Sequence, residues 1–284
     1  MLGTTKAKEN QMKLKEFVPP IMVKVAKRIK EGEALFISYE SALTACKSGY
    51  EEDDLINVVY EKTRIYRDSF LTQRPLVSEI NSLRTMAGLS LATRNNELNV
   101  IDFGGACGAH YFLARTIFGD SVNLRWHVVE TPRMASKATG LSDERLKFFY
   151  DIQKAKNELS RVDLLFSSST LQYVPRPYEF LKRLTECGAD KLFFTKIGLS
   201  TLQKELITIQ KSRLSGNGPG PMPEGMRDKE IKYPVTFSRK DKFEEILRKN
   251  YSIDIQFNED KRSYQAANHA IDLYGYFCSK KTEI

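Results

Sequence analysis

Asn99-Val100-Ile101-Asp102-Phe103-Gly104-Gly105-Ala106-Cys107-Gly108 is the stretch that decides the fold of this 284-residue chain. An apolar strand ends in an acid, a glycine-rich turn follows, and a helix is predicted to begin there. A second apolar strand, Trp126-His127-Val128-Val129, ends in Glu130, 22 residues after Gly108. This order of elements forms a nucleotide pocket in α/β sheets: glycines let the backbone approach a ligand, and the second acid can accept both ribose hydroxyls.

Strands and helices alternate on both sides of this unit, which predicts an α/β fold with a mostly parallel sheet covered by helices on both faces. The expected strands are 98–102, 124–130, 146–150, 162–167 and 190–196, and the expected helices are 108–118, 132–139, 152–158 and 177–187. A helix at 238–249 precedes strands 251–257 and about 271–278, and two strands without a helix between them predict an antiparallel edge hairpin. Residues 206–210 fit a strand or part of a helix, and residues 215–225, with four glycines and three prolines, are expected to form a loop.

The residues before the sheet are predicted to be helical, at about 38–48, 52–68 and 74–93, with a break at Gly49-Tyr50. This divides the chain into a basic tail with an amphipathic helix (1–35), a helical cap (36–95) and the sheet domain (96–284). In the helix expected at 20–31, apolar side chains share one face and most lysines and arginines lie off it. Such a helix either lies on an anionic membrane surface or packs on the main domain with its lysines exposed.

Composition narrows the classes of protein. The formal net charge of +8 favours an acidic partner but does not choose among nucleic acid, anionic lipid and phosphorylated substrate. Four scattered cysteines without a C-x-x-C pair, and three histidines, make disulfides and a metal site unexpected. No apolar run approaches 18 residues and the N-terminus does not resemble a signal peptide, so we expect a cytoplasmic location.

The glycine turn can be interpreted in two ways. A dinucleotide fingerprint needs G-x-G-x-x-G, which Gly104 and Ala106 match only loosely. The alternative is an acid followed by spaced small residues, Asp102-x-Gly104-x-Ala106-x-Gly108. Asp102 favours this second pattern, because a carboxylate suits the cationic end of S-adenosylmethionine and would repel a pyrophosphate. The predicted cofactor is therefore S-adenosylmethionine, with S-adenosylhomocysteine as its product and no metal.

Ligands in such sheets bind at the carboxyl ends of the strands, which supplies the candidate site residues. Glu130 is expected to bind the ribose, and Asp151 either the adenine amino group or, as an N-cap, the next helix. His110 is the candidate general base, with a packed or solvent-facing histidine as the alternative. The candidate cofactor residues are Asp102, Phe103, Gly104, Gly105, Gly108, Glu130, Asp151, Ser168 and Ser169. The candidates on the substrate side are Gln172, Tyr173, Lys196 and Tyr233.

At this point the chain resembles the class I S-adenosylmethionine-dependent methyltransferases, and more narrowly a methyltransferase family encoded in bacterial surface-polysaccharide gene clusters. The matching stretches span roughly residues 17 to 277. They are Ser38 to Ala42 with Gly49-Tyr50, Val100 to Gly105 with Gly108 and Tyr111-Phe112, Arg125 to Glu130, Ser168 to Val174, and Tyr233-Pro234 before Phe237-Ser238. The resemblance implies a Rossmann-like methyltransferase fold with a seven-stranded sheet, and cofactor roles for Asp102, Gly104 and Glu130. Thr195-Lys196 departs from the family, which has an aspartate-arginine pair there.

Three functions follow as hypotheses. The first is O-methylation of a sugar, glycan or lipid-linked glycan intermediate, with peripheral contact between residues 20–31 and the inner face of the membrane. The second is a catalytically degenerate binding module in a glycan-synthesis complex, because Ala106 departs from glycine and no base is unambiguous. The third is an RNA methyltransferase, motivated by the charge; without an RNA-binding module or an Asn/Asp-Pro-Pro-Tyr/Phe motif, nucleic acid is not the expected partner.

Overall fold

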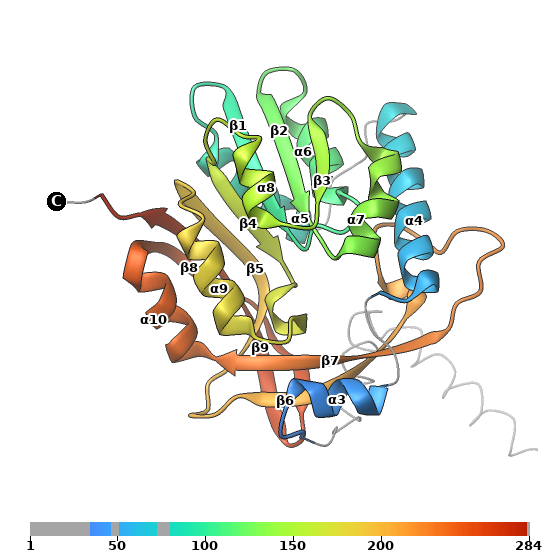
Figure 1. Cartoon of the computed structure of the whole chain (residues 1–284), viewed down its shortest axis with the longest axis vertical. Coiled ribbons are helices and arrows are strands. Elements are labelled where there is room, and N and C mark those ends of the chain that lie inside the picture. The colour runs from blue at the N-terminus through green and yellow to red at the C-terminus, as the bar shows by residue number, and fades with distance from the viewer. Residues whose placement is uncertain (1–34, 47–50, 73–79, 283–284) are drawn as a thin grey trace, which may run out of the picture.

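The computed structural model describes residues 35–46, 51–72 and 80–282 (Figure 1). The predicted tail and amphipathic helix at 20–31, the break at Gly49-Tyr50 and the first residues of the helix expected at 74–93 lie outside these ranges. None of the helices in the described ranges has the length and apolar character to cross a bilayer.

Helices and strands alternate from β1 to β5, as the sequence predicts. The helical cap contains α3 (Tyr39–Cys46), α4 (Asp53–Thr72) and α5 (Ile80–Ala92). The strands are β1 (Glu97–Phe103), β2 (Asn123–Val129), β3 (Leu146–Phe149), β4 (Leu164–Ser168), β5 (Lys191–Ser200), β6 (Leu206–Arg213), β7 (Glu230–Arg239), β8 (Tyr251–Ala266) and β9 (His269–Lys280). The remaining helices are α6 (Ala109–Phe118), α7 (Pro132–Ala138), α8 (Ile152–Asn157), α9 (Pro177–Glu186) and α10 (Lys240–Asn250), with short 3-10 turns at 139–141, 171–173 and 214–216.

The sheet confirms the predicted Rossmann-like α/β class. Strands β3, β2, β1, β4 and β5 lie side by side in that order and are all parallel. Strand β9 pairs antiparallel with β5, and β8 pairs antiparallel with β9, which is the predicted hairpin at the edge. These seven strands match the expected number, and β6 and β7 are added to them.

The β6–β7 hairpin is the main feature that the sequence does not predict. The two strands pair antiparallel over eight residue pairs, and β7 joins the end of β5 only through Leu199↔Ser238 and Ser200↔Arg239. In β7, Ile231, Tyr233, Val235 and Phe237 alternate as in a strand, but Pro234 argues against one. Pro234 is tolerated because it pairs only with Ile209 of β6. No strand of the described residues lies on its other side, so its missing N–H removes no hydrogen bond to a second strand.

The core has two halves, one on each face of the sheet. Side chains of α4, α5, α6 and α7 pack with Leu98, Val100 and Trp126 on one face. Side chains of α8, α9 and α10 pack with Ile101 and Phe103 on the other, as the arrangement in Figure 1 also shows. Strand β1 is therefore buried along both faces, and the ligand edge of the sheet is left at its carboxyl end.

Candidate functional site

The glycine turn after β1 adopts the left-handed backbone at every second residue. The φ angles are +75° at Gly104, +50° at Ala106 and +82° at Gly108. A Cβ on Gly104 would lie 2.2 Å from the Thr170 side chain, so only glycine fits there. Ala106 holds a conformation that glycine adopts more cheaply, and backbone strain of this kind persists where surrounding contacts fix it.

Glu130 provides those contacts. It follows β2 and lies across from the turn, where Oε1 accepts a hydrogen bond from the Ala106 N–H at 3.0 Å and Oε2 accepts one from the Thr131 N–H at 2.9 Å. Burial raises the pKa of this carboxyl, and the two N–H donors oppose that shift. A carboxylate has about four lone-pair sites, so both oxygens can still accept a further donor.

Glu130 and the turn line a cavity of about 220 Å³. Its walls come from the ends of β1, β2 and β4, from α4, and from the loop between β6 and β7. The residues that line it are Leu55, Val59, Gly104, Ala106, Glu130, Thr131, Met134, Ser168, Ser169, Thr170, Tyr173, Val174, Asn217 and Gly218. Five of the candidate residues therefore meet at one cavity: Gly104, Glu130, Ser168, Ser169 and Tyr173.

A larger hollow of about 1260 Å³ lies at the opposite, amino edge of the sheet, with Asp163, Asp190 and Lys191 among its lining residues. None of the candidate site residues lines it. Ligands of doubly wound sheets bind at the carboxyl edge, so the smaller cavity is the candidate site.

Asp102 lies beneath the turn and not in the cavity wall. Its side chain is fully buried on the α6 face, where Oδ2 accepts a hydrogen bond from Trp126 Nε1 at 3.0 Å. His110 Nδ1 is 3.7 Å from the same oxygen, and its ring packs edge-on against Phe166 at 4.9 Å. In this geometry Asp102 and His110 support the turn from below, and their predicted contacts with cofactor and acceptor stay predictions.

The other cofactor candidates occupy the same edge without lining the cavity. Phe103 packs 5.7 Å from Phe180 on the opposite face of the sheet, and Gly105 and Gly108 belong to the turn itself. Asp151 caps α8, where its Oδ1 accepts a hydrogen bond from the Lys154 N–H at 2.8 Å. That is the alternative the sequence left open, and an adenine contact of Asp151 stays a prediction.

The substrate-side candidates come together around Tyr173. Its hydroxyl donates to Gln210 Oε1 at 2.8 Å, and its ring packs edge-on against Tyr233 at 5.3 Å. The hydroxyl oxygen of Tyr264 lies 3.4 Å from the hydroxyl oxygen of Tyr173. Burial raises the pKa of Tyr173 well above its usual value, so this phenol stays neutral.

Gln172 and Lys196 meet one step further along the sheet edge. Gln172 Nε2 donates to the Lys196 carbonyl at 3.1 Å and lies 3.3 Å from Ser169 Oγ. Lys196 has a φ of +54° and its N–H donates to Glu259 Oε1 at 2.6 Å.

Several site residues were not predicted from the sequence. They are Leu55 and Val59 of α4, Asn217 and Gly218 of the loop, Gln210 of β6, and Glu259 and Tyr264 of β8. Only the glycine-rich loop carried a local signal. The others reach the site through the β6–β7 hairpin, the register of β8 and the packing of the cap. No group of three side chains suited to a metal occurs in the described part of the chain.

A scan of protein-family models finds no match to this chain, and a search of curated proteins finds none either. Solved structures are similar in fold. The CcbJ methyltransferase from Streptomyces caelestis has a TM-score of 0.45 and 8% identity, over 71% of this chain and 95% of that one. Human N-acetylserotonin methyltransferase in complex with SAM has a TM-score of 0.45 and 13% identity, over 92% of this chain and 66% of that one. The cyclase SpnF has a TM-score of 0.49 and 10% identity, over 89% and 100%. Similarity at this level does not assign a reaction, so any assignment has to rest on the residues of the site.

Proposed function

We propose that this protein is an S-adenosylmethionine-dependent methyltransferase. The observation that carries the proposal is Glu130, whose carboxylate is hydrogen-bonded to the left-handed turn of Gly104, Ala106 and Gly108 and lines a cavity with it at the carboxyl edge of a parallel sheet. A carboxylate in that place suits a ribose, and a turn with three glycines in five residues suits close approach of a ligand to the backbone.

The residues present fit the cofactor. Glu130 would accept the ribose hydroxyls, the turn would hold the ligand against its backbone, and Ser168 and Ser169 would supply hydroxyls at the end of β4. The cofactor, when bound, supplies a methyl group on a cationic sulfur. The chain's own contribution is alignment of the acceptor and exclusion of water, with walls from α4 and from Asn217 and Gly218.

The cofactor part of the proposal is tested by calorimetric titration of S-adenosylhomocysteine into the wild type and Glu130→Ala. We expect micromolar-range binding to the wild type and a fall of at least tenfold in the variant, because two hydrogen bonds to a charged group are lost. Glu97→Ala is the matched control: it also removes an acid at a strand end, but Glu97 is an exposed residue that pairs with Arg161 at the opposite edge. Lack of binding to folded wild-type protein would end the proposal.

The acceptor group that we propose is a neutral hydroxyl, on a sugar, a glycan or a lipid-linked glycan. Tyr173, Gln210, Tyr233 and Tyr264 support it, because they place neutral hydroxyl, amide and aromatic groups beside the cavity. Aromatic rings with a few placed polar groups are typical of small-molecule sites.

Radiolabelled methyl transfer tests the acceptor class, with neutral glycosides, nucleotide sugars, a polyprenyl-linked glycan and total RNA as the panel. Turnover of a hydroxyl acceptor that falls in Tyr173→Phe supports this assignment. Turnover of RNA alone contradicts it. Turnover of any glycan acceptor also excludes the alternative of a catalytically degenerate module.

The proposal extends to location. A cytoplasmic protein that contacts the inner membrane surface through residues 20–31 would meet lipid-linked glycans there. Sedimentation with vesicles containing anionic lipid should detect the contact, and a variant lacking residues 1–31 should lose it. Equal sedimentation of both proteins would contradict the membrane contact and leave the cofactor assignment intact.

A further inference from the structure

Strands β5 and β8 each have an irregular pairing with β9 near the edge of the site. The pairing of β5 with β9 shifts between Phe194 and Ile197, which leaves Thr195 and Lys196 as a bulge. The pairing of β8 with β9 shifts between Asn258 and Asp260, which leaves Glu259 unpaired in the ladder. Bulges next to functional sites redirect side chains or backbone groups, and neither of these belongs to the cofactor turn described above.

Glu259 crosses β9 to reach the bulge of β5. Its side chain is only 2% exposed, and Oε1 accepts a hydrogen bond from the Lys196 N–H at 2.6 Å. Gly275 of β9 lies opposite the bulge, and the space that its side chain would fill is taken by a ring from β8. The ring of Phe257, two residues before Glu259, lies 2.2 Å from the place that a Cβ on Gly275 would take.

The bulge is in turn bonded to the cavity wall. The Thr195 carbonyl accepts the Ser169 N–H at 2.9 Å, and the Lys196 carbonyl accepts Gln172 Nε2 at 3.1 Å. Ser169, which lines the cavity, has a φ of +57°, and Lys196 has +54°. Two strained non-glycine residues therefore persist because hydrogen bonds fix the peptides on each side of them.

The orientation of the Gln172 amide also follows from the bulge. The Lys196 carbonyl requires a donor, so Nε2 faces it and Oε1 faces away. Oε1 is buried and has no hydrogen-bond partner among the described residues. A buried amide oxygen without a partner costs free energy that a ligand hydroxyl or ammonium would recover.

We propose that Glu259 is a positioning residue: by holding the Thr195–Lys196 bulge it orients Ser169, which lines the cavity, and the Gln172 amide beside Ser169. The role rests on the proposed function for the identity of the ligand. It needs a hydrogen-bond acceptor and not a charge, because the contact with Lys196 is made to a backbone N–H. Arg84 of α5, 3.6 Å from Glu259 Oε2, ties the same carboxylate to the helical cap.

Calorimetric titration of S-adenosylhomocysteine into Glu259→Ala and Glu259→Gln tests the role. We expect roughly tenfold weaker binding in the alanine variant, because the bulge no longer holds Gln172 and Ser169 in place, and near-complete recovery in the glutamine variant, which keeps the acceptor oxygen. Gln172→Met, which keeps the volume but neither hydrogen bond, should weaken binding similarly. The double variant Glu259→Ala/Gln172→Met should be no weaker than the weaker single variant.

Glu244→Ala is the matched control. Glu244 of α10 is also largely buried and accepts a hydrogen bond from the Tyr276 hydroxyl, but it lies away from the cavity. It should lower the thermal midpoint without changing the affinity, which separates positioning from a general loss of stability. If Glu259→Ala fails to fold, Glu259→Gln and Gln172→Met decide: unchanged affinity in Gln172→Met, or no rescue by Glu259→Gln, overturns the role. Lack of binding to the wild type would instead refute the proposed function.

Discussion

Glu130 is the residue at which binding and stability are opposed. Burial raises the pKa of its carboxyl above the ordinary 4.5, so the folded protein binds this proton more readily than the unfolded chain. The stability from this group is therefore full below the unfolded pKa and is lost as the pH rises through the folded pKa. At neutral pH the charged, ligand-binding form is the destabilising one.

Glu130→Gln should therefore raise the thermal midpoint at pH 7 by about 2 °C, because it removes the buried charge and keeps one acceptor oxygen. At pH 4 the difference between the two proteins should shrink, since the wild-type carboxyl is then largely protonated. Differential scanning calorimetry at both pH values measures the effect. A lower midpoint for the variant at pH 7 would mean that the two N–H bonds outweigh the cost of burial.

Gly105 is a second residue with a specific cost. A Cβ there would lie 2.3 Å from Asp102 Oδ2, so Gly105→Ala should destabilise the protein by about 2–3 kcal/mol through overpacking, and should weaken S-adenosylhomocysteine binding. Gly220→Ala is the control: Gly220 has a φ of +70° with nothing within 4 Å of a Cβ, so only backbone strain of about 1 kcal/mol is expected. Urea unfolding followed by Trp126 fluorescence compares the two, and equal losses would contradict a steric role for Gly105.

At this scale the sequence predicts residues whose role is local. Gly104 and Glu130 follow from the order strand, turn, helix, strand, and both line the cavity. The Asp102 side chain alternates along β1 toward Trp126 and the α6 face, and its predicted contact with the cofactor stays a prediction. Glu259 could not be predicted, because its contact with Lys196 depends on irregularities in the pairing of β5 and β8 with β9.

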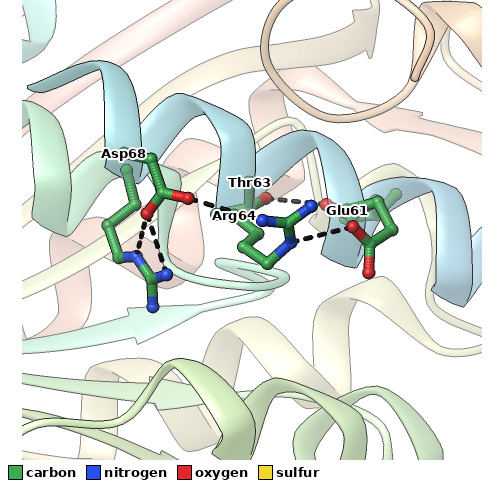
Figure 2. A network of polar contacts seen from close by, with 6 residues as sticks. Glu61, Thr63, Arg64 and Asp68 are labelled. Carbon is green, nitrogen blue, oxygen red and sulfur yellow. Dashed lines mark hydrogen bonds and ion pairs between the residues drawn. The ribbon is translucent and has the colours of Figure 1, made fainter. Parts of the chain in front are cut away.

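Among the elements, α4 has the most divided role. One face contributes Leu55 and Val59 to the cavity, while Arg64 on the partly exposed face pairs with Glu61 and Asp68, as Figure 2 shows. Lys62 lies between these faces, 2% exposed, and its Nζ donates to the Ser215 carbonyl at 2.8 Å. Burial lowers the pKa of Lys62, so α4 holds the loop by a costly buried ammonium.

The cavity of about 220 Å³ is smaller than the roughly 300–1,000 Å³ of typical ligand pockets, so a nucleoside-sized ligand requires a wall to move. Lys62→Met should loosen the loop wall at Asn217 and Gly218: backbone amides of 215–226 should exchange hydrogen faster, and S-adenosylhomocysteine should associate faster. Hydrogen-exchange mass spectrometry and stopped-flow fluorescence measure these. Arg64→Met, which breaks only partly exposed ion pairs, should leave both unchanged. Unchanged or slower exchange in Lys62→Met would contradict a role of Lys62 in holding the loop.

The base of the same loop is closed independently of Lys62. Asp228 accepts hydrogen bonds from Arg213 Nε and from the Ser215 N–H, and these donors, Arg213 first, lower its pKa to about 2. Its contribution is present above the unfolded pKa and is lost only as the pH falls through about 2. At neutral pH, the contacts of Asp228 with Arg213 and Ser215 should therefore persist in Lys62→Met.

The secondary structure was predicted correctly where apolar residues follow the spacing of a single element type, and incorrectly where they do not. The βαβ units from β1 to β5 have uniform apolar strands and clear helix starts. Strand β7 was missed because Pro234 outweighs the alternation of its apolar residues, and residues 206–210 could not be assigned as strand or helix without the partner that β7 provides.

The whole molecule is organised around one shared core on the α6 face. Leu55, Val59 and Leu89 of the cap pack in the same cluster as Trp126 and Phe166 of the sheet. The cap should therefore not unfold separately. We expect a single transition in urea, with far-ultraviolet circular dichroism and the fluorescence of Trp126, the one tryptophan of the sequence, superimposing.

Saturating S-adenosylhomocysteine should move that transition to higher urea without changing its slope, because it binds only the folded form. Two separate transitions, with the fluorescence change later than the helical signal, would show that the cap is an independent unit. Glu130→Ala is the control, since the same ligand concentration should shift its transition less, in proportion to its weaker binding.

The β6–β7 hairpin has a consequence for how such a protein could be diversified. The chain leaves the sheet after Ser200 and returns at Arg239, and these two residues are paired with each other. The segment between them is therefore a cassette with adjacent ends: a hairpin of another length or sequence could be spliced in without moving a strand that carries the cofactor turn. Selection for a new acceptor could change the sequence of residues 201–238 while the strands that hold the cofactor turn stay the same.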